Sequence, residues 1–402
     1  MKITNVEVIE FKVPSRSRVS RWGYSIWGGT HESTQSLTKI TADNGAEGYM
    51  LGGDKAAVEE QIRDLLVGEN PLDREKIWNW MYQSFTFNPG QSEPLIGVID
   101  CALWDLFGRM IDLPVHKILG GARDRITAYA STFPQLGGPD VYAQHALDCK
   151  AKGYKAYKVH AYICWDPHKW QPAPQLPGFP KEDVEVCRAI REAVGDDMVL
   201  MLDPFGVYTL EEALWVGREL EKLDYYWLEH PMPEFTVEAY RRLARELSIA
   251  ICSPEHVRGG VFSRAEWVLQ GAADMLRIDN NYGGITGSYK MVSICQAYGI
   301  QCEMHGGGWA NSQILGATTE ATCKYFERGL LRPELEYEVP EPYLEAICDP
   351  MDDDGNVILP TKPGLGMELD LGLHRRQPGV SGPSLCLCPV DYAAPPSARK
   401  RS

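Results

Sequence analysis

Three short apolar segments end in the same way: MVLMLDP (198–204), YYWLEHP (225–231) and IAICSPE (249–255). An acidic residue closes each segment, and Asp203, Glu229 and Glu255 follow one another at equal intervals of 26 residues. The stretches between the segments have the apolar spacing of amphipathic helices. Repeated strand–helix units of this kind predict parallel strands that are joined by right-handed crossovers.

The same pattern continues on both sides of these three units. Further apolar strands are expected at ITAYAST (126–132), YKAYKVH (154–160), DMLRIDN (274–280), IQCEMHG (300–306) and, less clearly, ELEYEV (334–339). Eight parallel strands with intervening helices close into a barrel. The count therefore predicts an α/β fold of the TIM-type (β/α) barrel class, not an open doubly wound sheet.

The remaining parts of the chain differ in composition from this region. The N-terminal part begins with the strand-like ITNVEVIEFKV (3–13) and turns helical after about residue 55, which indicates an α+β domain. The C-terminal end is rich in Pro and Ser and has no periodicity, so it is expected to be disordered. The predicted division is an α+β domain (1–122), a barrel (123–340), a segment returning to the first domain (341–372) and a tail (373–402).

The three acidic residues suggest a metal site. Carboxylates at the carboxyl ends of adjacent barrel strands point at one spot, where they repel one another unless a cation lies among them. A small set of oxygen ligands suits Mg²⁺. Helix capping or surface ion pairing could explain any one of these residues. Capping does not require equal spacing, however, so the regular interval favours metal binding by Asp203, Glu229 and Glu255.

Two further pairs of ionisable residues occur at predicted strand ends. Asp279 and His305 are again 26 residues apart. A carboxylate can fix the tautomer of an imidazole and raise its basicity, which makes a general base. Lys158 and His160 are two positions apart on one strand, so their side chains face the same side. Such a pair near a strand end must be paired or functional.

Composition limits the partners and the compartment. The 402 residues carry a formal net charge of −15, which argues against a nucleic-acid surface. The 11 cysteines are scattered, as expected of buried thiols in a reducing compartment. The N-terminus does not resemble a signal peptide, and no apolar run approaches the roughly 18 residues of a membrane span. The sequence thus predicts a cytoplasmic protein without a membrane or nucleic-acid partner.

Over about residues 1–370 the chain resembles the enolase superfamily, and within it the mandelate racemase-like group. The resemblance is carried by IDCALWDLFGRMIDLPVHKILGG (99–121), the three acids, the Asp279/His305 pair, the turn at 283–286 and PGLGMELD (363–370). It implies a capping domain, built mainly from the N-terminus, over a modified TIM-type barrel. It also implies chemistry in which a base removes a proton beside a carboxylate and Mg²⁺ stabilises the resulting ene-diolate.

The resemblance implies roles for particular residues. Asp203, Glu229 and Glu255 match the Mg²⁺ ligands, and Asp279 with His305 matches the catalytic pair. Lys158 matches a residue that neutralises the substrate carboxylate, while His160 stands where the family usually has a second lysine. His160 could be a base, an acid for the leaving group or a pocket wall.

Further contacts are expected around this centre. A glutamate after the eighth strand, for which Glu336 is the first candidate and Glu338 the competitor, is expected to hydrogen-bond the enolate oxygen. Candidate substrate contacts are Arg18, Arg21, Trp22, Tyr24, His31 and His256.

The expected function is Mg²⁺-assisted dehydration of a sugar acid, an aldonate or aldarate, to a 2-keto-3-deoxy acid. A racemase, epimerase or lactone cycloisomerase of the same superfamily is the first alternative. A non-catalytic metal-binding relative is the second. The partner is expected to be a small-molecule carboxylate, and the resemblance suggests a homo-oligomer.

Overall fold

The computed structural model describes residues 1–370 except 20–24, 85–91, 167–170, 175–176 and 334. The predicted tail at 373–402 therefore lies outside the described residues. Within the described part, no helix is both long and apolar enough to cross a membrane.

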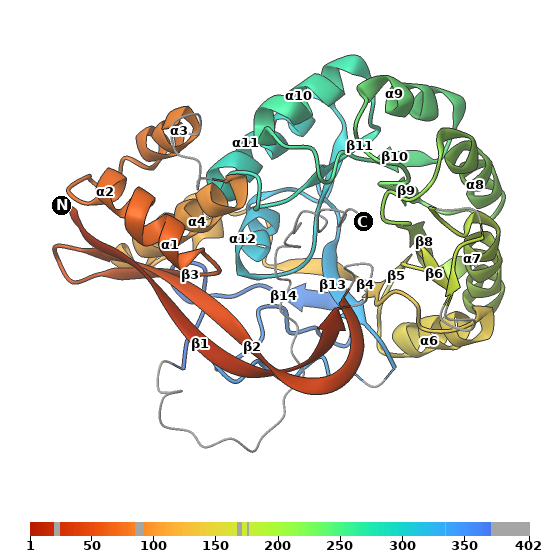
Figure 1. The fold of residues 1–402 in the computed structure, drawn as a ribbon, viewed down its shortest axis with the longest axis horizontal. Coiled ribbons are helices and arrows are strands. Elements are labelled where there is room, and N and C mark those ends of the chain that lie inside the picture. Colours follow the sequence, from red (N-terminus) through yellow and green to blue (C-terminus); the bar gives the residue numbers. More distant parts are fainter. Residues whose placement is uncertain (20–24, 85–91, 167–170, 175–176, 334, 371–402) are drawn as a thin grey trace, which may run out of the picture.

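The N-terminal part forms a three-stranded antiparallel sheet with helices on one side (Figure 1). Its strands are β1 (Ile3–Val19), β2 (Ser25–Ala42) and β3 (Glu47–Leu51). Its helices are α1 (Lys55–Ala57), a π-helical turn (Val58–Ile62), α2 (Arg63–Leu66), α3 (Arg74–Ser84) and α4 (Glu93–Met110). Gly48 lets α4 approach β3 closely, because a Cβ atom there would lie 2.4 Å from the carbonyl oxygen of Ala102.

The second part is a curled parallel sheet with helices on its outer side (Figure 1). The strands are paired in the order β12, β11, β10, β9, β8, β5, β4, β13. Their bounds are β4 (Arg125–Thr132), β5 (Ala156–Val159), β8 (Val199–Leu202), β9 (Trp227–Glu229), β10 (Ala250–Cys252), β11 (Met275–Ile278), β12 (Gln301–Met304) and β13 (Phe326–Leu331). The predicted fold class, a TIM-type barrel with an N-terminal capping domain, is confirmed.

One short helix, α5, precedes the first barrel strand, and helices follow the later strands as the sequence pattern predicted. They are α5 (Val115–Ile118), α6 (Pro139–Ala151), α7 (Pro180–Val194), a 3₁₀ turn (Gly195–Asp197), α8 (Leu210–Lys222), α9 (Val237–Glu246), α10 (Gly260–Gln270), α11 (Gly284–Tyr298) and α12 (Trp309–Ala317). A two-stranded hairpin, β6 (Trp165–Asp166) and β7 (Gln171–Pro172), follows β5. The helix α8 begins with a capping box between Thr209 and Glu212, which satisfies amide groups at its N-terminus.

The sheet meets itself between β12 and β13 through loop and side-chain contacts. The amide of Cys302 on β12 donates to the carbonyl of Thr322, and the amide of Gly306 donates to the carboxylate of Glu327 at 2.6 Å. On the other side, β13 pairs in parallel with β4. These contacts bring the ends of the first, seventh and eighth barrel strands into one ring.

Period-two alternation builds two layers inside this ring. A lower layer of buried, mostly apolar side chains includes Ala156, Met201, Trp227, Met275 and Tyr325. Two positions further along the same chain segments stand Lys158, Asp203, Glu229, Arg277 and Glu327. The same backbone geometry that fills the bottom of the barrel therefore aims five ionisable side chains into its upper part.

Helix α4 fastens the capping domain to the barrel through two buried acids. The carboxylate of Glu93 accepts the amide of Gly259 at 3.0 and 2.9 Å, just before α10 begins. The carboxylate of Asp100 accepts the amide of Thr286 at 2.8 Å and its hydroxyl at 2.6 Å in the first turn of α11. Both acids thus bind amides at the start of a barrel helix, where the helix dipole favours negative charge.

The C-terminal segment contacts both parts of the chain. Strand β14 (Asn356–Ile358) pairs antiparallel with β4 of the barrel. The amide of Leu365 donates to Asp105 on α4 at 2.8 Å, and the ring of Tyr343 packs against Phe11 on β1. The segment therefore spans from the barrel to the capping domain.

Candidate active site

The three acids that end β8, β9 and β10 come together as predicted. One carboxylate oxygen from each of Asp203, Glu229 and Glu255 lies within 4.8 Å of the others, and all three residues are buried. Each follows the carboxyl end of a parallel strand, and these ends share one face of a barrel. The equal intervals in the sequence therefore correspond to neighbouring positions in space. The three oxygen donors can hold a metal ion.

Lys158 on β5 lies beside these acids. Its ammonium nitrogen is 3.1 Å from Glu229, 3.6 Å from Asp203 and 2.9 Å from Glu327, and the side chain is 1% exposed. Burial and the nearby Arg277 act to lower the pKa of Lys158, but the surrounding carboxylates outweigh them and raise it above its ordinary value. Lys158 is therefore a fixed positive charge.

Arg277 on β11 is a second buried cation in the same layer. Its guanidinium lies 2.7 Å from Glu229 and 2.5 Å from Glu327, and it also donates to the carbonyl of Met304. Sequence reasoning did not single out this residue, although it stands on β11 two positions before Asp279, which directly follows the strand. That spacing places the two side chains on one face of the strand.

The carboxylates of this layer outnumber its lysine and arginine cations. Four carboxylates, from Asp203, Glu229, Glu255 and Glu327, face the two cations of Lys158 and Arg277. The difference is two negative charges when the imidazoles of His230 and His305 are neutral, and it is offset when both are protonated. A buried excess of this size is unfavourable unless a cation compensates it, and one divalent ion carries the matching charge.

His305 and Asp279 form the predicted pair. Nδ1 of His305 lies 2.6 Å from Oδ2 of Asp279, whose other oxygen accepts the amide of Asn281 at 2.7 Å. The carboxylate of Asp279 accepts the hydrogen on Nδ1. The other ring nitrogen, Nε2, faces the acidic cluster and lies 2.9 Å from Glu255. Burial acts to lower the pKa of His305, but the charges of Glu255 and Asp279 outweigh it and raise that pKa. The side chain is still 29% exposed, so solvent reaches it.

His160 makes contacts that sequence reasoning did not foresee. Its Nδ1 lies 2.7 Å from the carbonyl oxygen of Thr132, and its Nε2 lies 2.9 Å from Oδ2 of Asp203. The ring packs on Phe205 and is 2% exposed. Because a carbonyl can only accept, Nδ1 carries a hydrogen, and Nε2 faces the carboxylate of a candidate metal ligand.

The structure places the eighth strand elsewhere than the sequence suggested. ELEYEV (334–339) was the expected strand, but β13 is FERGLL (326–331). Glu336 and Glu338 are exposed, and Glu338 pairs with Arg328 at 2.6 Å. Glu327 on β13 is the glutamate that reaches the cluster, so the assignment of Glu336 is corrected. The signal was the alternation of Tyr325 and Glu327, which continues the two inner layers of the barrel.

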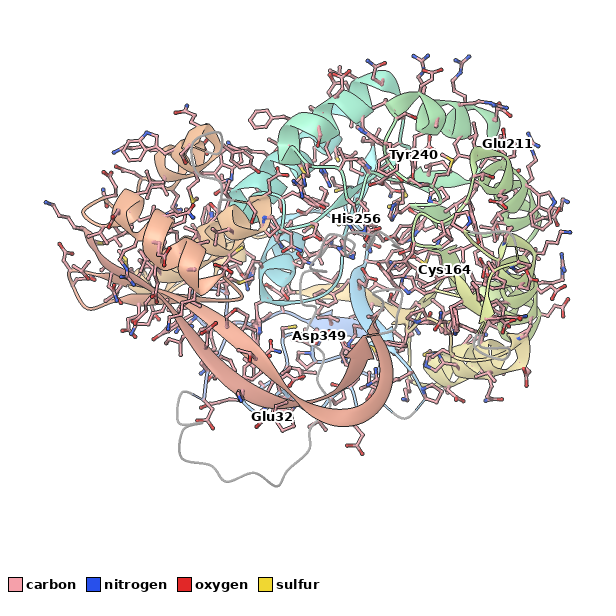
Figure 2. The ribbon with its side chains drawn as sticks, viewed as in Figure 1. Glu32, Cys164, Glu211, Tyr240, His256 and Asp349 are labelled. Atoms are coloured by element: carbon pink, nitrogen blue, oxygen red, sulfur yellow. The ribbon has the colours of Figure 1, made fainter. Side chains whose placement is uncertain are left out.

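The predicted substrate contacts are only partly described. Arg21, Trp22 and Tyr24 lie outside the described residues, as do the side chains of Arg18 on β1 and His31 on β2. His256 is placed beside the acids, with Nε2 3.4 Å from Oε1 of Glu255 and a side chain that is 27% exposed. Figure 2 shows it on the inner side of the ring of strands, whereas Glu211 on α8 lies at the outer edge.

Two residues near His256 were missed by sequence reasoning. His230, directly after β9, has Nδ1 3.0 Å from Oε2 of Glu255 and is buried. Glu234 accepts the backbone amides of Glu255 and His256, each at 2.7 Å. Burial acts to lower the pKa of His230, but Glu234 and Glu255 raise it to about 9. Three imidazoles, of His230, His256 and His305, thus surround the carboxylate of Glu255.

Comparison with known proteins agrees with this arrangement. Residues 141–372 match the family model described as enolase C-terminal domain-like, and residues 27–120 match the mandelate racemase / muconate lactonizing enzyme N-terminal domain. The chain therefore belongs to the enolase superfamily, in its mandelate racemase / muconate lactonizing enzyme group, and the predicted resemblance is confirmed.

Several enzymes of named activity are similar to this chain over most of their length. The arabinonate dehydratase of Saccharolobus solfataricus is 27% identical over 84% of this chain and 88% of its own. The D-galactarolactone cycloisomerase of Agrobacterium fabrum is 28% identical over 83% and 88%. A crystal structure of D-glucarate dehydratase from Agrobacterium tumefaciens, complexed with magnesium, is 36% identical with a TM-score of 0.87 and covers 92% of this chain and 97% of its own.

Proposed function

We propose that this protein is a Mg²⁺-dependent dehydratase of a sugar acid, an aldonate or an aldarate, that forms a 2-keto-3-deoxy acid. The observation that carries the proposal is the position of Nε2 of His305, which faces the Asp203, Glu229 and Glu255 cluster while Asp279 holds Nδ1. A base is thereby fixed beside a site that favours a divalent cation. Similarity to named dehydratases of arabinonate and glucarate supports the same substrate class.

The donor set fits Mg²⁺. Asp203, Glu229 and Glu255 offer oxygen atoms only, which Mg²⁺ prefers, and three protein ligands leave coordination positions for other oxygens. Bound there, Mg²⁺ would offset the excess negative charge and act as a Lewis acid toward carboxylate oxygens of the substrate. Lys158 holds a second positive charge at the same place, 3.1 Å from Glu229 and 2.9 Å from Glu327.

Residues of the chain carry out the proton transfers and stabilise the charge that develops. His305 accepts the proton from the carbon beside the substrate carboxylate, and Asp279 stabilises the imidazolium that forms. Lys158 stabilises the negative charge that develops on the carboxylate oxygens, and Glu327, held by Lys158 and Arg277, lines the same place. The imidazolium of His305 then returns its proton to the departing 3-hydroxyl group, which leaves as water. The proton taken from carbon therefore balances the proton lost to water.

His160 takes a supporting part in this scheme. Its two ring nitrogens face Thr132 and Asp203. His160 therefore orients the metal ligand Asp203 and does not act as a second base. Racemisation needs competent bases on both faces of the reacting carbon, and this arrangement does not favour it. A lactone cycloisomerase stays the second candidate, because the similarity to D-galactarolactone cycloisomerase also spans most of the chain.

A substrate screen tests the proposal. The purified protein with Mg²⁺ is incubated with a set of aldonates and aldarates, and semicarbazide detects 2-keto products. We expect one or a few stereoisomers to react and Asp203→Asn to abolish the signal. A blank screen, together with new signals in proton NMR of lactones and sugar acids in D₂O, would replace dehydration with isomerisation. Cytoplasmic location and homo-oligomeric assembly remain part of the proposal.

A further inference from the structure

We propose that the chain holds a second divalent-cation site, formed by His230, Glu255 and His256, that prefers a first-row transition ion such as Co²⁺ or Zn²⁺ to Mg²⁺. The site adjoins the Asp203, Glu229 and Glu255 cluster and shares Glu255 with it. It goes beyond the proposed dehydration, because its existence does not depend on which substrate reacts.

The three side chains have the spacing of ligands around one ion. Nδ1 of His230 lies 3.0 Å from Oε2 of Glu255, and Nε2 of His256 lies 3.4 Å from Oε1. One ligand atom from each residue lies within 4.8 Å of the other two. Two donors at right angles around an ion at about 2.1 Å are roughly 3 Å apart, so these separations suit a shared cation.

A buried nitrogen in this group lacks a hydrogen bond. His230 is 7% exposed, and although its Nδ1 is close to Glu255, the direction of approach does not make a hydrogen bond with any described residue. A buried polar atom is normally satisfied by a partner. An ion in contact with Nδ1 of His230 and Oε2 of Glu255 would satisfy both atoms.

The backbone holds the His230 ring in place. His230 has a positive φ of 37°, its amide donates to the carbonyl of Cys252, and its carbonyl accepts the amide of Gly206. Gly206 leaves room for the ring, because a Cβ atom there would lie 2.5 Å from Nε2 of His230. The ring therefore cannot turn freely, and its nitrogen is oriented before any ion binds.

The other two ligands share a single support. Glu234 accepts the amide of Glu255 with one oxygen and the amide of His256 with the other, each at 2.7 Å. This contact fixes the backbone of two consecutive ligands. The rings of His230 and His256 stand 4.8 Å apart at 70°, so they approach from different directions.

The donor atoms decide the class of ion. Two imidazole nitrogens with one carboxylate bind Co²⁺, Ni²⁺ or Zn²⁺ more strongly than Mg²⁺, which prefers oxygen ligands. The neighbouring cluster of three carboxylates lacks nitrogen donors and suits Mg²⁺. The chain can therefore hold two different ions side by side, with the second beside His305, whose ring lies 6.1 Å from that of His256.

Cobalt binding in the presence of excess Mg²⁺ tests the proposal. Metal-free full-length protein is saturated with Mg²⁺ and titrated with Co²⁺, with visible absorption to follow nitrogen coordination and equilibrium dialysis to count ions. We expect one bound Co²⁺ per chain. His256→Gln should weaken Co²⁺ binding at least tenfold, and so should His230→Asn. The matched control is His145→Gln. His145 is a buried histidine on α6 that contacts Tyr157, and its variant should bind Co²⁺ like the wild type.

Two further outcomes separate this proposal from that of the first site. Asp203→Asn should lose Mg²⁺ binding and keep Co²⁺ binding, since Asp203 is not a ligand of the second ion. Anomalous scattering at the cobalt edge should then place one ion between His230 and His256. Unchanged Co²⁺ affinity in His256→Gln, with its fold verified by circular dichroism, would overturn the second site and leave the proposed dehydration untouched.

Discussion

The ammonium of Lys158 and a carboxylate oxygen of Glu327 lie 2.9 Å apart inside the barrel, and both side chains are almost fully buried. Lys158 is on β5 and Glu327 on β13, the two strands that flank β4. Burial acts to raise the pKa of Glu327, but Lys158 and Arg277 outweigh it and hold that pKa well below its ordinary value. This ion pair joins the second and eighth strands at the level of the acidic cluster.

Replacement of Glu327 tests its assignment to the active site. Glu327→Gln removes the anion that holds Lys158 and Arg277 in position, and kcat should fall about 100-fold, because Lys158 is then less well placed to stabilise the charge that develops on the substrate. Glu336→Gln is the matched control and should keep wild-type kcat and KM, because Glu336 is exposed. Steady-state kinetics with the best substrate measures both. A loss of kcat in Glu336→Gln, together with wild-type kcat in Glu327→Gln, would return the role to Glu336.

Replacement of His305 separates proton transfer from metal binding. His305→Asn should lower kcat by about 10²–10⁴, the range typical of losing a general base. Mg²⁺ affinity, measured by calorimetry, should stay within a few-fold of wild type, since His305 contacts the ligand Glu255 but offers no oxygen donor. Turnover at the wild-type rate in this variant would exclude His305 as the base.

Removal of the metal should destabilise the fold. A divalent ion that binds the acidic cluster only in the folded state stabilises the native state by mass action, by about 2.7 kcal/mol when its concentration is 100 times Kd. Differential scanning calorimetry should show a lower Tm after EDTA and a recovery with Mg²⁺. Asp203→Asn should show no such response. A response of equal size in that variant would move the metal away from Asp203.

The Asp100 carboxyl makes stability depend on pH. Burial raises the pKa of Asp100 from its ordinary value to about 7 in the fold, against the opposing effect of the hydrogen bonds from Thr286. A group whose pKa is raised on folding favours the fold below its unfolded value of about 4, and this contribution is lost as pH rises through 7. Asp100→Asn should therefore lose less stability than wild type between pH 5 and 8.

Urea unfolding at several pH values measures this difference. The comparison of variant with wild type isolates Asp100 from other buried acids, such as Asp183, whose pKa burial also raises to about 7. If the free energy of unfolding changed with pH in the same way in both proteins, Asp100 would ionise normally in the fold.

The regular part of the barrel was readable from the sequence because each unit has one strand, one helix and short loops. Equal lengths placed Asp203, Glu229 and Glu255 at equal intervals, and Asp279 and His305 at the same interval. Parallel strands in register then bring these residues to one face. The spatial cluster follows from spacing alone.

The eighth unit breaks this rule. The chain between α12 and β13 has no helix long enough to keep the interval, and an acidic stretch after the strand resembles a strand more than the true one does. Glu336 therefore attracted the assignment that belongs to Glu327. The contacts of His160 with Asp203 and of Arg277 with Glu229 were also beyond sequence reasoning, because they depend on which side chains meet across neighbouring strands.

The two acids of α4 also have a mechanical consequence. Glu93 and Asp100 hold the starts of α10 and α11, so the capping domain is joined to the barrel at two buried points on one helix. Any separation of the two parts would have to break these buried hydrogen bonds, and a buried polar group left without a partner costs free energy.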